Sequence, residues 1–290
     1  MKKNYAMLAM LNDLSMKYKW IYLLFGVLML FYACSSNDEP EVPKAKPEPR
    51  LSKVDSLALV KIYQAADGDN WRNGKWDLND FMTWSGVSAY LDTVHNEYRV
   101  CELYIRATSE AHGTLSPSLG DLTELRSLIF TDGANIKGRI PKTLSNLVNL
   151  VELGISGTSC AGGIPVEIFL LPQLKWLNIF NNKNLGGELP EEIALIERPE
   201  AVFDFTNCGL SGKIPKGIKV KYIRLWDNQY TEFPFEYCLQ DYTTLSMQRN
   251  YISGVIPDYI LENEKAMKAL RIMTLNQQDG CTFSNAPEGW

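Results

Sequence analysis

The side chains that most often carry catalysis are sparse in this sequence of 290 residues, which holds only two histidines and six cysteines. His95 lies in a polar turn and His112 in a loop, and neither has a carboxylate or nucleophile at a spacing typical of a catalytic pair. General acid–base and nucleophilic catalysis need such partners within hydrogen-bond reach. No nucleotide-binding, metalloprotease or hydrolase motif is present. We therefore expect two solvated histidines and a protein that is not an enzyme.

The cysteines do not form a pattern that would hold a metal. Apart from Cys34, five cysteines follow at irregular spacings, which differ from the regular spacings of zinc sites and disulfide frameworks. Cys160 occupies an aliphatic position of the repeat described below and Cys208 the bend position, so we expect both to be buried thiols, two repeats or about 10 Å apart. That separation is too large for a disulfide. A Cys238–Cys281 bridge stays open, and we expect neither a metal nor a cofactor.

Residues 1–33 have the features of an export signal. An apolar run covers residues 20–33 and follows a stretch that contains lysines. A membrane-spanning helix needs about 20 apolar residues, so this run is short for a transmembrane anchor, which stays the alternative. Its length and flanks are typical of the core of a signal peptide. Met16 opens a shorter version with the same features, so either methionine can be the true start.

The end of this run, FYAC at residues 31–34, resembles a bacterial lipoprotein cleavage box. The resemblance implies cleavage before Cys34 and acylation of its thiol and new amino group, for example with palmitate. Several lipid chains on one residue give stable anchoring. Residues 35–39 (SSNDE) are similar to the signal that sends some Gram-negative lipoproteins to the outer face of the outer membrane. We expect a lipid-anchored protein at the outer membrane that faces the cell exterior, with the periplasmic side as the alternative.

Residues 34–50 are expected to form a lipidated tether between the membrane and a folded body. Four prolines lie among charged residues in the segment PEVPKAKPEPR at 40–50, which contains almost nothing apolar. Proline-rich segments of this kind are semi-extended spacers that hold no core of their own.

The elements that must position any functional side chain come from an internal repeat. A Leu or Ile followed by Pro recurs, usually two residues after a glycine, and the aliphatic positions lie 19 to 25 residues apart along the chain. The clearest copies are GRIP (138–141), GGIP (162–165), GELP (187–190), GKIP (212–215) and GVIP (254–257). A short strand with two apolar residues at alternate positions precedes each copy. These predicted inward pairs are Leu103/Ile105, Leu128/Phe130, Leu153/Ile155, Leu177/Ile179, Phe203/Phe205, Ile223/Leu225 and Leu245/Met247.

The composite pattern, LxxLxLxx(N)xLxGxIPxxLxxLxx, resembles the plant-type leucine-rich repeat over residues 100–275. The resemblance implies an α/β repeat solenoid, a horseshoe with a parallel β-sheet on its concave face. One repeat cannot bury its apolar side alone, and stacked neighbours complete a shared core. We expect Asn182, Asn228 and Asn250 at the bend after each strand, where their amides would bind backbone groups of the next coil. Cys208 takes that place in the fifth repeat.

Solenoid ends need caps, and we assign residues 51–99 and 276–290 to them. Ser52 and Asp55 fit a capping box that opens a helix over 53–66. The segment that follows is rich in tryptophan and resembles the N-terminal flank of plant-type repeat proteins, although it lacks the paired cysteines usual there.

The side chains that point outward from the strands are the candidates for binding. Trp and Tyr, with Arg, are the residues most enriched in binding hot spots. Since neighbouring strands lie about 4.8 Å apart, two outward aromatic pairs on the fourth and sixth repeats should stand about 10 Å from one another. The predicted ligand-binding patch consists of Trp176, Phe180, Asp204, Tyr222, Arg224 and Trp226. The alternative is that these aromatic side chains only pack on their neighbours along the sheet.

The charge of the chain excludes one class of partner. The net charge is −5, and residues 1–34 hold four lysines against one aspartate, so the rest of the chain is more acidic still. Nucleic-acid binding needs clustered Lys and Arg, and no basic stripe is present. Two functions remain: a surface module that binds a glycan, peptide or protein, or a structural or adhesive envelope protein without a discrete ligand. The aromatic cluster favours the first, and the ligand and the oligomeric state stay open.

Overall fold

The computed structural model describes residues 48–241 and 243–290. The chain divides into two compact units, Met1–Pro47 and Glu48–Trp290, and the second is described here. The expected export signal, the expected lipidation site Cys34 and the expected tether up to residue 47 lie outside the described residues. Within the described part, no helix has both the length and the apolar character that crossing a bilayer would require.

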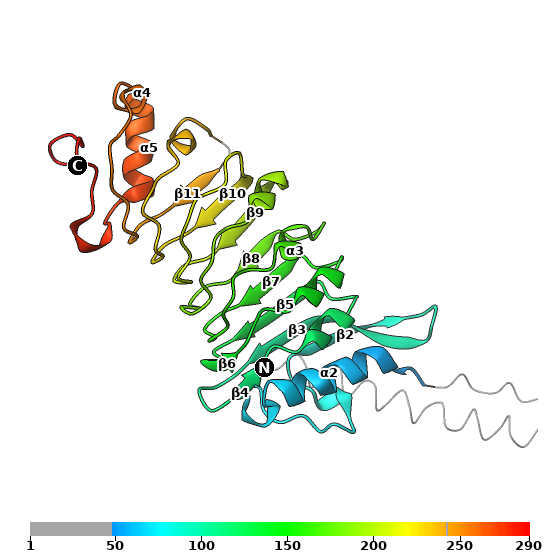
Figure 1. Cartoon of the computed structure of the whole chain (residues 1–290). Helices are drawn as coiled ribbons and strands as arrows, with labels where there is room; N and C mark the ends of the chain where they lie inside the picture. Colours follow the sequence, from blue (N-terminus) through cyan, green and yellow to red (C-terminus); the bar gives the residue numbers. More distant parts are fainter. Residues whose placement is uncertain (1–47, 242) are drawn as a thin grey trace, which may run out of the picture. The chain divides into compact units, whose positions relative to one another are not determined.

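One sheet of nine strands runs along the stack of repeats (Figure 1). Its order is β1-β3-β5-β7-β8-β9-β10-β11, and β2 pairs with β3 outside this path. All neighbours from β3 to β11 are parallel, whereas β2 runs antiparallel to β3 and projects with it as a hairpin. The strands are β1 (Arg50–Leu51), β2 (Val87–Asp92), β3 (Glu97–Arg106), β5 (Ser127–Thr131), β7 (Glu152–Ile155), β8 (Trp176–Asn178), β9 (Glu197–Asp204), β10 (Lys219–Arg224) and β11 (Thr244–Ser246).

Every predicted inward pair is buried in the structure, which confirms the register of the repeats. The strand pairing aligns the first member of each pair in one row across seven strands: Leu103, Leu128, Leu153, Leu177, Phe203, Ile223 and Leu245. Because side chains alternate along a strand, this register sends the residues between the pairs to the opposite side of the sheet. The sheet therefore has one apolar side in the core and one open side, which we call the sheet face.

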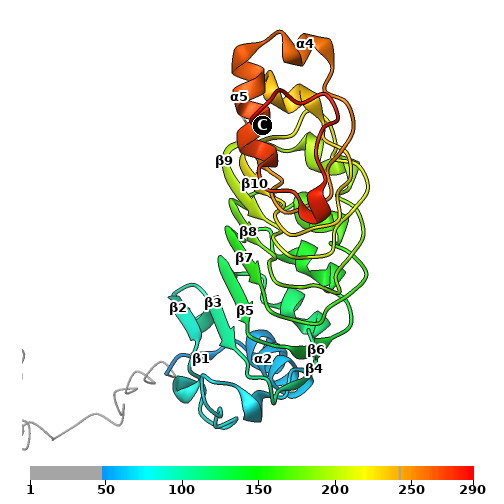
Figure 2. The ribbon, with the colours of Figure 1, turned by 90° about the vertical axis from the view of Figure 1, so that its left-hand side faces the viewer.

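Short helices cover the other side of the core, as Figure 2 shows. Proline from the repeated aliphatic–proline motif is the N-cap residue of most of them, where its missing N–H leaves no helical hydrogen bond unmade. They are η4 (Pro117–Asp121), η5 (Lys142–Asn146), α3 (Val166–Phe169), η6 (Glu191–Leu195), η7 (Phe235–Cys238) and α4 (Asp258–Leu261). A second parallel sheet has two strands, β4 (His112–Thr114) and β6 (Asn135–Lys137). Each of them follows a strand of the large sheet in the sequence and precedes a short helix.

The N-terminal end is covered by helix α2 (Lys53–Ala65), followed by the short turns η2 (Gly68–Asn70) and η3 (Phe81–Thr83). The predicted capping box is wrong. Ser52 is the N-cap residue, but its side chain makes no capping hydrogen bond. The Asp55 carboxylate is fully buried and instead accepts hydrogen bonds from Arg99 Nε at 3.0 Å and from the Val100 N–H at 2.8 Å. A long-range partner on β3 thus replaces the local one, and it fixes the helix to the first strand of the solenoid.

The C-terminal end is covered by α5 (Glu264–Thr274), η8 (Gln278–Gly280) and the segment that follows. The Met247 N–H donates to the Met273 carbonyl at 2.8 Å, so the chain after β11 continues the backbone ladder of the strands. Phe283 is buried against this end. The thiols of Cys238 and Cys281 are free, so the bridge that the sequence left open is not formed.

Candidate binding surface

The outward side chains of β8, β9 and β10 form three rows on the sheet face. Strand register sets the first row and the middle row, and two backbone hydrogen bonds beyond the strand ends set the third, from Asn181 to the Thr206 carbonyl and from Asn207 to the Trp226 carbonyl. The first row is Trp176, Val202 and Tyr222; the middle row is Asn178, Asp204 and Arg224; the third row is Phe180, Thr206 and Trp226. The structure thus brings all six predicted site residues together on one surface.

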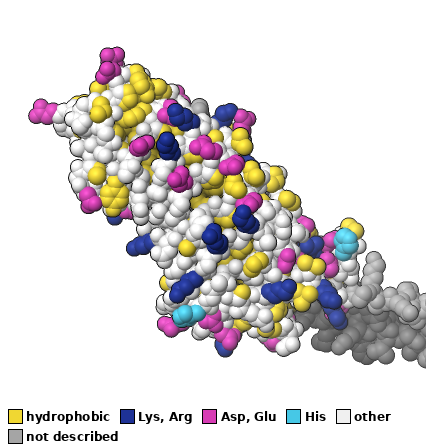
Figure 3. All heavy atoms as spheres, viewed as in Figure 1, with side chains coloured by type: hydrophobic (Ala, Val, Ile, Leu, Met, Phe, Trp, Pro, Cys, Tyr) yellow, Lys and Arg dark blue, Asp and Glu magenta, His cyan; other side chains and the backbone are white. Residues whose placement is uncertain are grey.

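The four aromatic side chains of this surface are open to solvent. Trp176 is 44% exposed, Trp226 42%, and Phe180 and Tyr222 are each 37% exposed. Each aromatic row has large rings in the repeats of β8 and β10 and a smaller side chain in the repeat of β9 between them. Figure 3 shows the face seen in Figure 1, where hydrophobic side chains gather at the end of the solenoid that carries α4 and α5 and charges of both signs lie along the rest. We call the six residues the sheet-face patch.

The middle row of the patch is polar. Arg224 Nη1 lies 3.3 Å from Asp204 Oδ2, and the other oxygen of Asp204 accepts a hydrogen bond from the Thr206 N–H at 3.0 Å. The side chain of Arg224 is 46% exposed and that of Asp204 is 18% exposed. Lys221 Nζ lies 5.6 Å from the centre of the Tyr222 ring, within cation–π range. A solvent-exposed ion pair contributes only about 0–1 kcal/mol to stability. The fold therefore does not depend on this pair.

Buried amides hold the backbone beneath the third row. Asn182 Nδ2 donates to the carbonyls of Ile155 at 2.8 Å and Phe180 at 3.3 Å, and its Oδ1 accepts from the Thr158 N–H at 2.9 Å. Asn228 repeats the arrangement and donates to the Trp226 carbonyl at 3.1 Å. The asparagines lie at the predicted bend, but they bind the preceding coil and not the next one. Their hydrogen bonds fix the chain at both aromatic residues of the third row.

Cys208 replaces asparagine in this ladder. Its Sγ donates to the Ile179 carbonyl at 2.6 Å, and burial raises the pKa of the thiol to about 12. The raised pKa keeps the thiol protonated at neutral pH, so it remains a hydrogen-bond donor. As predicted, Cys208 and Cys160 are buried and free.

A line of left-handed residues directly after the third row was not predicted from the sequence. The backbone angle φ is 57° at Asn181 and Asn207 and 55° at Asp227, and Gly157 takes a similar conformation. Asn207 Nδ2 donates to Asn181 Oδ1 at 2.9 Å along this line. Asn, Asp and Gly tolerate the left-handed region best. Their recurrence one residue after each outward third-row position was the available signal.

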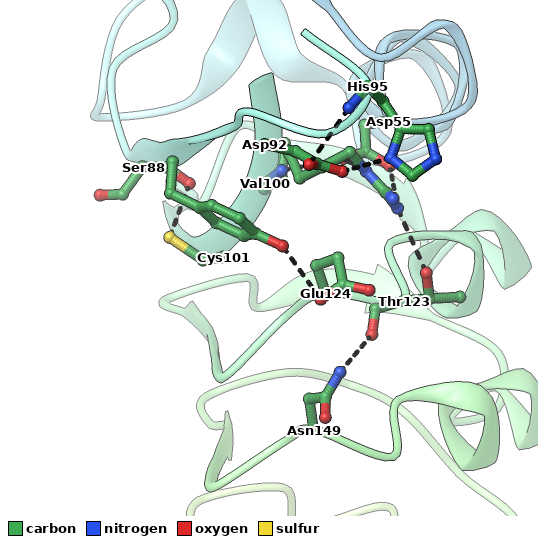
Figure 4. A network of polar contacts seen from close by, with 11 residues as sticks. Asp55, Ser88, Asp92, His95, Val100, Cys101, Thr123, Glu124 and Asn149 are labelled. Atoms are coloured by element: carbon green, nitrogen blue, oxygen red, sulfur yellow. Dashed lines mark hydrogen bonds and ion pairs between the residues drawn. The ribbon is translucent and has the colours of Figure 1, made fainter. Parts of the chain in front are cut away.

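A polar network at the N-terminal end joins the β2–β3 hairpin to the first repeat (Figure 4). Tyr90 Oη donates to Glu124 Oε2 at 3.2 Å, and Arg99 reaches Thr123 Oγ1 at 3.3 Å. His95 Nδ1 lies 2.6 Å from Asp92 Oδ2, and this hydrogen bond raises the pKa of His95 and lowers that of Asp92. His95 is exposed as expected, but it has a carboxylate partner that its spacing in the sequence did not suggest.

The described residues contain no group of three His, Cys, Asp or Glu side chains that could hold a metal ion. The six residues of the sheet-face patch offer four aromatic surfaces and one ion pair, with the amide of Asn178 beside it.

Comparison with solved structures identifies the architecture. The described fold superposes on the crystal structure of PEPR1–AtPEP1 with a TM-score of 0.55 and 22% sequence identity, over 77% of this chain and 31% of that chain. The fold is a leucine-rich-repeat solenoid. In sequence, the solenoid is similar to phytosulfokine receptor 1 of Arabidopsis thaliana, with 35% identity over 150 residues. It is also similar to polygalacturonase inhibitor 2 of the same plant, with 33% identity over 105 residues.

These similarities are partial. The match to phytosulfokine receptor 1 covers 52% of this chain and 14% of the receptor, and the match to polygalacturonase inhibitor 2 covers 36% of this chain and 31% of the inhibitor. No family model matches the sequence. The solenoid thus spans less than a third of either relative's length.

Proposed function

We propose that this chain is a recognition module that binds a peptide, protein or glycan through the sheet-face patch and catalyses no reaction. The observation that carries the proposal is the group of four aromatic side chains, each 37–44% exposed, around one ion pair. Apolar surface that a fold leaves in water stabilises a complex when a ligand covers it, by about 25 cal/mol per Å². Exposed apolar patches on soluble proteins commonly mark interaction surfaces.

The rigidity of the patch supports the same function. Four of the six side chains project from strands of a continuous sheet, and buried amides fix the backbone at Phe180 and Trp226 just beyond the strand ends. A site built on rigid elements loses little conformational entropy when a ligand binds. The relatives support a binding role as well, since one is a receptor and another an inhibitor, and PEPR1 was solved as PEPR1–AtPEP1.

The proposal also includes the cellular location of this module. Acylation of Cys34 would anchor the chain in the outer membrane of a Gram-negative bacterium, and the tether would hold the solenoid away from the membrane on the exterior side. The proline-rich composition of residues 40–50 supports such a spacer. The acidic balance of the chain supports a partner other than nucleic acid.

Binding to arrays of many candidate ligands tests this proposal while the ligand is still unidentified. The purified chain and the double variant Trp176→Ala/Trp226→Ala would be applied to peptide and glycan arrays under identical conditions. We expect that a defined set of array spots binds the wild type and does not bind the double variant. If the two proteins give the same pattern, the patch is not the binding site, and the adhesive or structural alternative is then favoured.

A further inference from the structure

We infer that the ligand of the sheet-face patch is an acidic, proline-rich peptide in the polyproline II conformation, lying across β8, β9 and β10 along the middle row. This inference rests on the proposed function and names the ligand class for the same site. It follows from the spacing of the aromatic side chains, from the unused polar groups between them and from the charges at the border of the patch.

The patch has the form of a lane with aromatic borders and a polar floor. Trp176 and Phe180 lie four residues apart on one repeat, so the first and third rows are separated by about 13 Å at 3.3 Å per residue. The middle row lies between them and carries Asn178, Asp204 and Arg224. A single extended chain that runs perpendicular to the strands can place side chains against both borders while its backbone lies over the floor.

The spacing along the lane selects the conformation of that chain. On each border the aromatic residues belong to the repeats of β8 and β10, two strand separations or about 9.6 Å apart. A polyproline II helix has three residues per turn and rises about 3.1 Å per residue, so residues on the same side repeat every 9.3 Å or so. A β-strand repeats its side at about 6.7 Å, which would miss the second aromatic residue by almost a whole residue. The lane therefore fits polyproline II, in which prolines at i and i+3 reach one border and those at i+1 and i+4 the other.

The floor can bind the backbone of such a peptide. Polyproline II makes no internal hydrogen bonds, so its carbonyl groups are free to accept. Among the described residues no partner binds the side-chain amide of Asn178, and it can donate. Arg224 has five N–H donors and its guanidinium is half exposed beside Asp204. Aromatic borders with donors between them are the chemistry by which proteins recognise proline-rich segments.

The charges at the border of the first row indicate the sign of the peptide. Lys175 precedes Trp176 and Lys221 precedes Tyr222, and in the described part of the chain neither ammonium group forms an ion pair with a carboxylate. The carboxylate of Glu152, next to Trp176 in the same row, accepts a hydrogen bond from Ser127 Oγ at 3.1 Å. Positions i and i+1 of each three-residue turn contact the aromatic borders, and position i+2 contacts neither. Acidic side chains at position i+2 would complement the charge of Lys175 and Lys221.

Tryptophan fluorescence titration with four synthetic probes tests this inference. The probes are (Pro-Pro-Glu)4, its register control (Pro-Glu)6 of the same length, its charge control (Pro-Pro-Lys)4, and cellohexaose as a glycan. We expect saturable binding of (Pro-Pro-Glu)4, with binding of both peptide controls at least about tenfold weaker and none of cellohexaose. Trp226→Ala should weaken (Pro-Pro-Glu)4 about thirtyfold, the usual effect of losing a hot-spot aromatic residue.

The variants Asn178→Ala and Lys221→Glu complete the test, because both positions are on the surface and leave the core intact. Each should weaken (Pro-Pro-Glu)4 while the unfolding curve stays that of the wild type. Equal binding of (Pro-Glu)6, or no binding of (Pro-Pro-Glu)4, overturns the inference. Binding of cellohexaose that depends on Trp226 also overturns it, but leaves the sheet-face patch as a binding site. The array pattern of the Trp176→Ala/Trp226→Ala variant decides the proposed function separately.

Discussion

The guanidinium of Arg224 lies 3.3 Å from the carboxylate of Asp204, and the two residues face each other from adjacent parallel strands. Their register places one positive and one negative charge at the centre of a surface that has aromatic rings on both sides. The pair limits the net charge at that centre, and it leaves most donors of Arg224 available to a ligand. Both effects come from the solenoid, because equal repeats bring equivalent positions side by side.

The stacking of the repeats can be tested at Leu177, which is fully buried between the coils before and after it. Leu177→Ala should reduce the free energy of unfolding by about 2–5 kcal/mol, as in other buried leucines. Asn178→Ala, one residue away on the sheet face, should cost under about 0.5 kcal/mol, the usual figure for a surface position. Urea melts measure both. Similar losses for the two variants would show that the register is shifted by one residue.

The buried amide ladder makes a second stability prediction. Asn182→Ala leaves the Thr158 N–H and the Ile155 carbonyl without their partner, and each buried unpaired group costs about 1–3 kcal/mol. The matched control is Asn184→Ala, because Asn184 is exposed in the same loop. We expect a clear drop in the thermal midpoint for the first variant and almost none for the second. An unchanged midpoint for Asn182→Ala would mean that water replaces the amide.

The sequence was sufficient to predict the positions of the core and of the patch, for a physical reason. Strand side chains alternate, so once a repeat shows two apolar residues such as Phe203 and Phe205, the residues beside them must face outward. The side chain of Asp204, between Phe203 and Phe205, must therefore point to the open side of the sheet. The same rule brought Trp176 and Tyr222 into one row, two strands apart.

Other features depend on contacts that no local pattern contains. Asp55 had a local role in a predicted capping box, yet Arg99, 44 residues later, provides two hydrogen bonds and a charge that the helix end cannot match. The direction in which Asn182 binds follows from the offset between successive coils, which the repeat pattern does not specify.

The hairpin carries a pH-dependent contact. The Asp92 carboxylate holds the pKa of His95 above its ordinary value of 6.5, so His95 remains charged to a higher pH in the folded chain than in the unfolded chain. The stabilisation is fully present below pH 6.5 or so and is lost as pH rises through the raised pKa. An NMR titration of the His95 ring should show a midpoint above 6.5 that falls toward this value in Asp92→Asn. Identical midpoints in the two proteins would exclude the contact in solution.

The anchoring proposal makes a prediction about Cys34. If this residue is acylated, a fatty-acid probe should label the wild-type chain in cells, and Cys34→Ala should remain uncleaved or be released from the outer membrane. Cys101→Ala is a suitable control, because it removes a thiol of the folded body and leaves the cleavage box unchanged. Equal labelling of wild type and Cys34→Ala would contradict lipidation at this position.

The central claim is that the sheet-face patch binds the ligand, and isothermal titration of single variants measures this most directly. The strongest ligand from the arrays would be titrated into the wild type, Trp176→Ala, Trp226→Ala and the outward but distant Ile129→Ala. Loss of a hot-spot aromatic residue costs about 2 kcal/mol, or thirtyfold in affinity. We expect that loss for both tryptophan variants, wild-type affinity for Ile129→Ala, and unchanged unfolding midpoints for all three. Wild-type affinity in both tryptophan variants would contradict the account and place the site elsewhere, with the N-terminal cap as the next surface to test.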